Sequence, residues 1–415
     1  MDNLTHALAG MLLAEAATQL ALRRAPQRPV SWRNTAYWVS IAANNFGDLD
    51  FLYARITSGR VGYLLHHRGH THTVAAVLPI ALLVLIGAWS WARWRGHQHR
   101  RAGWSALTGL ALIGAVLHLL MDASNDYGVH PFWPFDSRWH YGDAVFIIEP
   151  FFWLAAAPPL FAAARSRAGK AALALILGFG VAAAWISGYV RVPNALVLTA
   201  LTPALLLWAT RVSPLLRVGL GLAGWSSLTV LFLAAHARAE SIAAAALAKD
   251  FAPAITVDQV LTPFPGDPFC FRLIALQRDQ DRLHARIGVL SSAPELLDPR
   301  SCPAPIDQPT ALLSPVAPTT SAGVVWRGER SASIAELRAL AEESCHARAM
   351  LRFLRAPFWQ PDREGRIVLG DLRYDREPGL GFAEMVLPGA DTPCPRHVPP
   401  WAFPRSELIG DVSPR

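Results

Sequence analysis

Residues 66–73 of the chain read HHRGHTHT, a run in which four histidines stand beside an arginine and a glycine. Neutral imidazole binds zinc and other divalent transition ions, and it titrates close to neutral pH, so the run indicates a metal site or a pH switch. Its histidines cannot all point the same way from a regular helix or strand, and we expect a turn at Gly69. Arg68 suits a bound phosphate or carboxylate; the alternative is an interfacial arginine that reaches toward water.

Three other polar sets interrupt the apolar background of the first 150 residues. They are His6, the pair Asp48 and Asp50 in NNFGDLD, and a long stretch that begins HLLMD at His118. His118 and Asp122 are four residues apart, so they share one face of a helix at the end of an apolar run. Ionisable groups are costly to bury there, and a bound metal ion would offset that cost.

Imidazoles and carboxylates together form the ligand set of zinc or another divalent transition ion. A pH switch accounts for the histidines but not for the carboxylates, and a lone interfacial histidine or a helix-capping DxD accounts for only one set at a time. The candidate metal ligands are His6, Asp50, His67, His72, His118 and Asp122. Asp48 and Glu149 are the candidates for a catalytic base or for a group that orients a ligand, and Arg68 is the candidate for substrate binding.

Long apolar segments must position these residues. Runs about long enough to cross a ~30 Å bilayer core occupy residues 73–91, 104–121, 144–164, 171–190, 195–209 and 218–235. The N-terminal stretch MDNLTHALAGMLLAEAATQLALRR has an acid and no base before its apolar part, the reverse of a signal peptide, so we expect a retained helix. If residues 35–53 also cross, the chain makes eight passes; the alternative there is a re-entrant segment.

The basic residues mark the ends of the apolar segments. One set of short loops carries Arg23, Arg24, Arg28, Arg33, Arg93, Arg95, Arg100, Arg101, Arg165, Arg167, Lys170, Arg211 and Arg217, and the intervening loops carry Arg55, Arg60, Arg68, Arg138 and Arg191. The positive-inside rule assigns the richer set to the cytoplasm and the histidine run to the outer face. Because the net charge of +7 is spread in this way, we expect no nucleic-acid partner.

The part of the chain after the last apolar run differs in character. All four cysteines, Cys270, Cys302, Cys345 and Cys394, fall there, without a CxxC spacing, which favours two disulfides over a zinc cluster. Short β-type runs such as RLIALQ, RLHARIGVL and GRIVLGDLRY alternate with Pro, Gly and Asp, and residues 333–354 indicate a helix that Ser333 and Glu336 cap. We therefore predict a helical membrane domain over 1–240 and a small α+β extracytoplasmic domain over 251–415, the fold being mainly α.

The motifs DNLTHALAG, GDLD, HRGHTHT, HLLMD followed by YG, WPF and FIIEPFFW, in this order, make the chain resemble the YdjM-type family, described as metal-dependent hydrolases of the inner membrane and also called LexA-binding inner membrane-associated hydrolases. The likeness covers roughly the first 155 residues. It implies roles for His6, Asp48, Asp50, His67, His72, His118 and Asp122. Glu149 stands where many members have Asp, and His70 occupies a variable position. The family is in turn considered similar to zinc-dependent phospholipase C, which implies phosphate-ester chemistry.

These observations predict a multi-pass protein of a bacterial inner membrane that uses a divalent metal ion, zinc being the ion expected. Its substrate would be a phosphate or acyl ester of a lipid-like molecule at the outer membrane face, so membrane lipid is the expected partner. The alternative is a non-enzymatic metal-binding envelope protein, sensor or transporter. Conduction would need a polar path to the cytoplasmic face, and the helices after Pro150 hold almost no ionisable residues.

Overall fold

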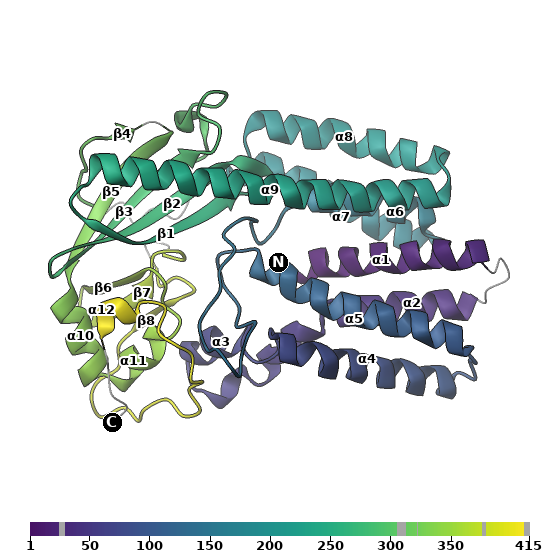
Figure 1. Ribbon diagram of the computed structural model, residues 1–415, viewed down its shortest axis with the longest axis horizontal. Helices are drawn as coiled ribbons and strands as arrows, with labels where there is room; N and C mark the ends of the chain where they lie inside the picture. Colours follow the sequence, from purple (N-terminus) through teal and green to yellow (C-terminus); the bar gives the residue numbers. More distant parts are fainter. Residues whose placement is uncertain (25–29, 305–312, 322, 376–378, 411–415) are drawn as a thin grey trace.

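The fold is that of a computed structural model, which describes residues 1–24, 30–304, 313–321, 323–375 and 379–410. Long helices lie side by side in one bundle, and two β-sheets lie together beyond one end of it (Figure 1). The bundle helices are α1 (Asn3–Arg24), α2 (Val30–Ala43), α4 (Val74–Trp94), α5 (Arg101–Ala123), α6 (Pro150–Ala163), α7 (Arg167–Ile186), α8 (Val192–Arg211) and α9 (Pro214–Asp250). The chain is therefore mainly helical with a C-terminal sheet domain, as predicted.

Five of the described helices are long and apolar enough to cross a membrane, namely α4, α5, α7, α8 and α9. The predicted count of eight passes is not supported. Residues 144–149 lie outside any helix, so the apolar run expected over 144–164 contains only the 14 residues of α6. At ~1.5 Å per residue α6 spans roughly 21 Å, less than the ~30 Å core. Likewise α2 ends at Ala43, short of the predicted 35–53 segment.

The bundle brings the polar sets to one end because successive helices run in opposite directions. His6 lies in the first turns of α1, whereas Asp122 lies in the last turn of α5. A short 3-10 helix, η1 (Phe46–Leu52), follows α2 and carries Asp48. The histidine run joins α3 (Arg60–His66) to α4, whose first turn is capped when the side chain of Thr73 accepts a hydrogen bond from Ala76 N at 3.0 Å.

Helix α9 connects the bundle to the sheet domain. Its first half is apolar enough to cross a membrane. Its second half presents a stripe of small residues, including Ala239 and Ala243, to a core that also contains Phe271 and Leu290. The helix therefore runs without a break from Pro214 to Asp250. Small side chains let the helix approach the sheet closely, so one continuous element passes from the bundle to the second domain.

The sheet domain contains two antiparallel sheets in the described residues. The larger has the order β1-β2-β3-β5-β4, and the smaller has the order β6-β7-β8. The strands are β1 (Ile255–Phe264), β2 (Asp267–Asp279), β3 (Arg282–Ser291), β4 (Thr320–Ser321), β5 (Val324–Ser333), β6 (Pro357–Pro361), β7 (Ile367–Asp371) and β8 (Glu384–Val386). The runs RLIALQ and RLHARIGVL lie in β2 and β3, and the part IVLGD of the third run forms β7, so strands are confirmed in all three runs.

The helix predicted over 333–354 is interrupted. It forms α10 (Ile334–Glu343) and α11 (Cys345–Leu351), and Ser344 breaks it because its side chain caps α11 by accepting from Ala347 N at 3.2 Å. The predicted capping box is absent: Ser333 makes no side-chain cap bond, and Glu336 accepts a hydrogen bond from Trp359 Nε1 at 3.1 Å. A last short helix, α12 (Ser406–Ile409), packs against α10.

The two parts of the molecule share a hydrophobic core. Val61, Leu64 and Leu65 of α3 pack in the same cluster as Phe353 and Trp401 of the sheet domain. Trp401 is fully buried, and its Nε1 donates a hydrogen bond to Leu65 O at 2.7 Å. The segment that leads into the histidine run is therefore held by the C-terminal domain as well as by the bundle.

Two disulfides join Cys270 to Cys302 and Cys345 to Cys394. This confirms the prediction of two disulfides, and it supplies the connectivity that the sequence alone leaves open. The first anchors the segment after β3 to β2. The second ties the C-terminal segment that carries Trp401 to the start of α11, so it helps to hold that segment against the bundle.

Protein purified from its native membrane should therefore carry no thiol that reacts with a maleimide until a reductant is added. Proteolysis and mass spectrometry without reduction should recover peptides joined as Cys270–Cys302 and Cys345–Cys394. Four thiols that react before reduction would contradict this prediction. A peptide linking Cys270 to Cys345 would contradict the connectivity.

Candidate metal centre

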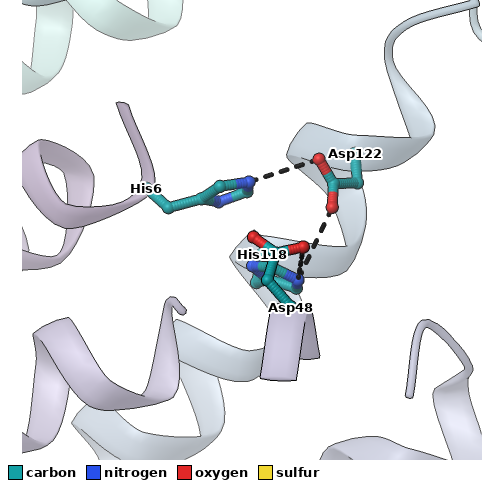
Figure 2. Close-up of side chains that lie close together, drawn as sticks. All are labelled: His6, Asp48, His118 and Asp122. Carbon is teal, nitrogen blue, oxygen red and sulfur yellow. Dashed lines mark hydrogen bonds and ion pairs between the residues drawn. The ribbon is translucent and has the colours of Figure 1, made fainter. Parts of the chain in front are cut away.

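Four side chains from three separate segments converge at the sheet-domain end of the bundle. They are His6 of α1, Asp48 of η1, and His118 and Asp122 of α5, and each offers one ligand atom within 4.8 Å of the others (Figure 2). His6, His118 and Asp122 are buried, and Asp48 is 9% exposed. Asp48 also lines a hollow of about 880 Å³ that opens to the surface. The cluster is thus enclosed on the bundle side and accessible beside Asp48.

His72 stands at the centre of this group. Its Nε2 lies 2.8 Å from Asp122 Oδ2, 3.0 Å from His118 Nε2 and 3.4 Å from Asp48 Oδ1. Zinc–nitrogen bonds of ~2.0–2.1 Å in a tetrahedral site place neighbouring ligand atoms roughly 3.3 Å apart. The observed separations bracket that value, so these residues fit a divalent cation without large movement of the backbone.

Hydrogen bonds from neighbouring groups orient the two central imidazoles. His118 Nδ1 lies 2.8 Å from Asn44 O, a carbonyl that can only accept, so Nδ1 carries the proton and Nε2 presents its lone pair to the cluster. His72 Nδ1 lies 3.4 Å from Asp50 Oδ2 and 3.0 Å from Thr71 Oγ1. Such outer contacts fix the tautomer and the ring plane of metal-binding histidines.

Asp122 carries the most deeply buried negative charge of the cluster. Its Oδ1 accepts from Arg68 NH2 at 3.0 Å and lies 3.2 Å from His6 Nε2, and the amine of Met1 also contacts it. A carboxylate within an apolar bundle needs such partners, because burying an unpaired charge is very costly. His6 Nδ1, in contrast, is buried without a partner among the described residues.

Asp50 organises the histidine loop rather than the cluster itself. Its Oδ1 lies 3.0 Å from His67 Nδ1, and its Oδ2 accepts hydrogen bonds from Arg68 N at 2.8 Å and from Thr71 Oγ1 at 3.0 Å. Arg68 has a φ of 59°, in the left-handed region that a residue with a Cβ rarely adopts. The bond from its amide to Asp50 holds this strained turn in place.

The charges around the loop favour a cation. Burial lowers the pKa of His72, but hydrogen bonds to Asp122, Asp48 and Asp50 outweigh burial and raise it to about 10. Burial raises the pKa of Asp48, whereas a hydrogen bond with His72 and the charges of nearby histidines lower it to about 2. The pKa of Asp50 lies below its usual range because hydrogen bonds to His67 and His72 outweigh burial. The carboxylates thus stabilise positive charge where the ligand atoms meet.

The structure brings together nearly all the residues that the sequence singled out. His6, His72, His118 and Asp122 meet directly, Asp48 joins them, and Asp50 and His67 stand behind His72. Arg68 is only 1% exposed. Its guanidinium pairs with Asp122 inside the protein, and the residue also lines the hollow. The catalytic and binding roles assigned to these residues stay predictions.

Glu149 and His70 lie apart from this group. Glu149 caps α6 by accepting from Phe151 N at 3.1 Å, and its other oxygen accepts from Gly266 N, in the β1–β2 turn, at 2.8 Å. Burial raises its pKa to about 8, although both hydrogen bonds lower it. Glu149 therefore joins the bundle to the sheet domain. His70 packs against Trp133 and Trp401, with ring centroids 4.7 and 4.8 Å away.

Sequence reasoning missed three contributors to the site. Gly47 lies so close to His118 that any Cβ at this position would collide with its Nε2. Asn125 accepts a hydrogen bond from Arg68 NH1 at 2.6 Å. Trp401 lies against the loop from the far end of the chain. The glycine in FGDLD could have indicated a close contact at Gly47. The partners of Asn125 and Trp401 become apparent only in the folded structure.

One comparison, with a family of inner membrane proteins, agrees with the apolar helices of the bundle. No curated protein and no solved structure matched the chain. Residues 1–191 match the model of a family described as YdjM inner membrane protein, and this segment contains every residue of the His–Asp cluster. This N-terminal part, 191 of the 415 residues of the chain, is therefore similar to the YdjM family of inner membrane proteins.

Proposed function

We propose that this protein is a membrane-embedded, metal-dependent hydrolase that acts on a phosphate or acyl ester of a lipid-like substrate. The observation that carries the proposal is the meeting of three imidazoles and two carboxylates, at separations suited to one cation, beside an open hollow. His6, Asp48, His72, His118 and Asp122 would hold the ion. A divalent ion, for which zinc fits the donor set, supplies Lewis acidity that activates water and polarises an ester oxygen.

Among the described residues that line the hollow, we assign His67 as the proton acceptor. It lines the hollow, and its Nδ1 lies 3.0 Å from Asp50 Oδ1. A carboxylate in this position orients the ring and stabilises the imidazolium that forms when the other nitrogen takes a proton. We assign this role to His67 in place of Glu149, whose two oxygens are occupied by backbone amides.

The surroundings of the hollow support a lipid-like substrate. Leu49 and Phe51, on its rim, are 41% and 52% exposed although both are apolar. Exposed apolar residues beside a polar cleft, at the end of an apolar helical bundle, suit a molecule with a hydrocarbon chain and a polar head.

We propose that the centre faces the outside of an inner membrane. The basic residues that end α4 and begin α5 and α9 lie at the end of the bundle away from the sheet domain (Figure 1). The positive-inside rule assigns that end to the cytoplasm. The two disulfides of the sheet domain suit an oxidising compartment on the other side.

Gly47→Ala should weaken metal binding at least ~10-fold, because the new Cβ displaces His118 from its hydrogen bond to Asn44 O. The matched control is Gly87→Ala in α4, where a Cβ meets nothing within 4 Å. Elemental analysis and titration of the chelator-treated, full-length variants measure the effect. Equal metal affinity of the two variants would show that His118 is not a ligand.

Asp122→Asn should reduce ester hydrolysis to the background rate while the protein still inserts into the membrane. The change removes a ligand but leaves the apolar segments that drive insertion untouched. The control is Asp136→Asn, which removes a carboxylate from an exposed ion pair with Arg138. Activity is measured on a panel of phosphate and acyl esters of short-chain lipids.

Two results would contradict the hydrolase proposal. Equal turnover by wild-type protein and by metal-free Asp122→Asn would show that hydrolysis occurs elsewhere. Metal-loaded wild-type protein that turns over no ester of the panel would favour the alternative, a non-enzymatic metal-binding envelope protein.

A further inference from the structure

A second hollow of about 370 Å³ lies beside the first, between the bundle and the sheet domain. The two share Tyr63, His67, Arg68 and Ile147, so they form adjoining compartments beside the histidine loop. The first, outer compartment borders Asp48 of the metal centre. The second, inner compartment is walled by both parts of the molecule, and the sheet domain contributes Thr262, Phe264, Arg272, Arg373, Tyr374 and Phe382.

Three side chains that line the inner compartment hold buried hydrogen-bonding atoms without a partner in the described part of the chain. These atoms are Arg68 Nε, Asn125 Nδ2 and Tyr374 OH. Arg68 and Asn125 are each 1% exposed. Buried polar atoms are nearly always hydrogen-bonded, so three such donors around one cavity indicate a ligand that accepts hydrogen bonds.

The orientation of the Asn125 amide follows from its contacts. Its Oδ1 accepts hydrogen bonds from Arg68 NH1 at 2.6 Å and from Tyr127 N at 3.0 Å. Both partners can only donate, so the oxygen must occupy this position and the Nδ2 donor must take the other. The same contact fixes Arg68, whose NH2 also binds Asp122, so the inner compartment is linked directly to the metal centre.

The inner compartment is rich in guanidinium groups, and two of them also pair with buried carboxylates, Arg68 with Asp122 and Arg373 with Asp371. Three guanidinium groups, those of Arg68, Arg272 and Arg373, line it against one carboxylate, that of Asp126. Arg272 NH2 donates to Leu372 O at 2.9 Å, and Arg373 pairs with Asp371. Thr262 Oγ1 donates to Asp126 Oδ2 at 2.7 Å. Two of the three arginines thus come from the sheet domain, which supplies most of the positive charge.

We propose that the inner compartment binds the phosphate group of an anionic lipid head, and that the sheet domain thereby selects the substrate. A phosphate has more acceptor oxygens than a carboxylate and meets donors from several directions, as Arg68, Asn125 and Tyr374 require. The proposal rests on the proposed hydrolase function. The hydrocarbon chain would lie along Leu49 and Phe51 at the rim of the outer compartment, and the ester would pass the metal centre at the junction.

Calorimetric titration of full-length protein in detergent tests this assignment with three probes. They are phosphatidic acid with two six-carbon chains, diacylglycerol with the same chains but no phosphate, and inorganic phosphate. Phosphatidic acid should bind most tightly, inorganic phosphate more weakly and diacylglycerol least. Equal binding of phosphatidic acid and diacylglycerol would overturn the proposal. Equal binding of phosphatidic acid and inorganic phosphate would show that the compartment binds the free ion, and it would overturn the proposal that the ligand is a lipid.

Two variants locate the binding. Tyr374→Phe removes one hydroxyl and should weaken phosphatidic acid binding roughly tenfold. Asn125→Asp keeps the acceptor for Arg68 but replaces the donor by a charged oxygen, so it should weaken binding further. Tyr141→Phe is the matched control, because its buried hydroxyl also has no partner among the described residues but does not line the compartment. Metal content is measured for each variant and should stay unchanged in Tyr374→Phe and Tyr141→Phe, which change no partner of Arg68 or of the ligands.

The outcomes separate this proposal from the hydrolase function. Phosphatidic acid binding that Tyr374→Phe and Asn125→Asp weaken, in a protein without esterase activity, would support the compartment and contradict only the hydrolase function. Wild-type affinity and turnover in both variants would overturn the compartment while leaving the hydrolase function standing.

Discussion

The buried charge of Asp122 is the constraint on which the rest of the site depends. A carboxylate at the end of an apolar helix must be neutralised by groups that reach it from other segments. Arg68, His6 and His72 supply this neutralisation from two directions. Removing one partner of a buried ion pair typically costs about 3–5 kcal/mol, a large fraction of the stability of a domain. The need to satisfy Asp122 therefore ties the histidine loop, α1 and α5 into one arrangement.

The sheet domain packs against this arrangement and contacts it at two places. Trp401 stacks on His130 with ring centroids 3.8 Å apart and holds Leu65 O, just before the histidine loop. On the opposite side, Glu149 binds Gly266 N, and Arg191 pairs with Asp267 in the same β1–β2 turn. Two attachments far apart in the sequence make the position of the sheet domain well defined. A compartment shared by both parts is then a stable feature of the molecule.

The sequence predicts which polar residues meet, because the alternation of helix directions sends them to one end. It does not predict which of these residues join the cluster and which hold the histidine loop. We expected Asp50 among the metal ligands and Asp48 as a base or orienting group, but the 3-10 turn of η1 directs Asp48 to the cluster and Asp50 to the histidine loop. The turn expected at Gly69 is real, but the left-handed residue is Arg68, held by Asp50.

Contacts between residues far apart in the sequence, and the exact start of a helix, could not be predicted. Glu149 was expected to act as a base or to orient a ligand, and its contact with Gly266 could not be predicted because Gly266 lies 117 positions away. The count of membrane passes failed for a local reason: residues 144–149 are apolar enough to extend a run, yet they lie outside α6. Hydropathy measures composition, whereas the length of a helix also depends on where its first turn is capped.

X-ray absorption at the metal edge of purified full-length protein identifies the atoms that bind the ion. We expect a single shell of nitrogen and oxygen at about 2.0–2.2 Å, with the outer-ring scattering of imidazole and no sulfur. A shell at about 2.3 Å from sulfur would place the metal on the cysteines instead and would contradict the account. So would a protein that binds no divalent metal ion at all.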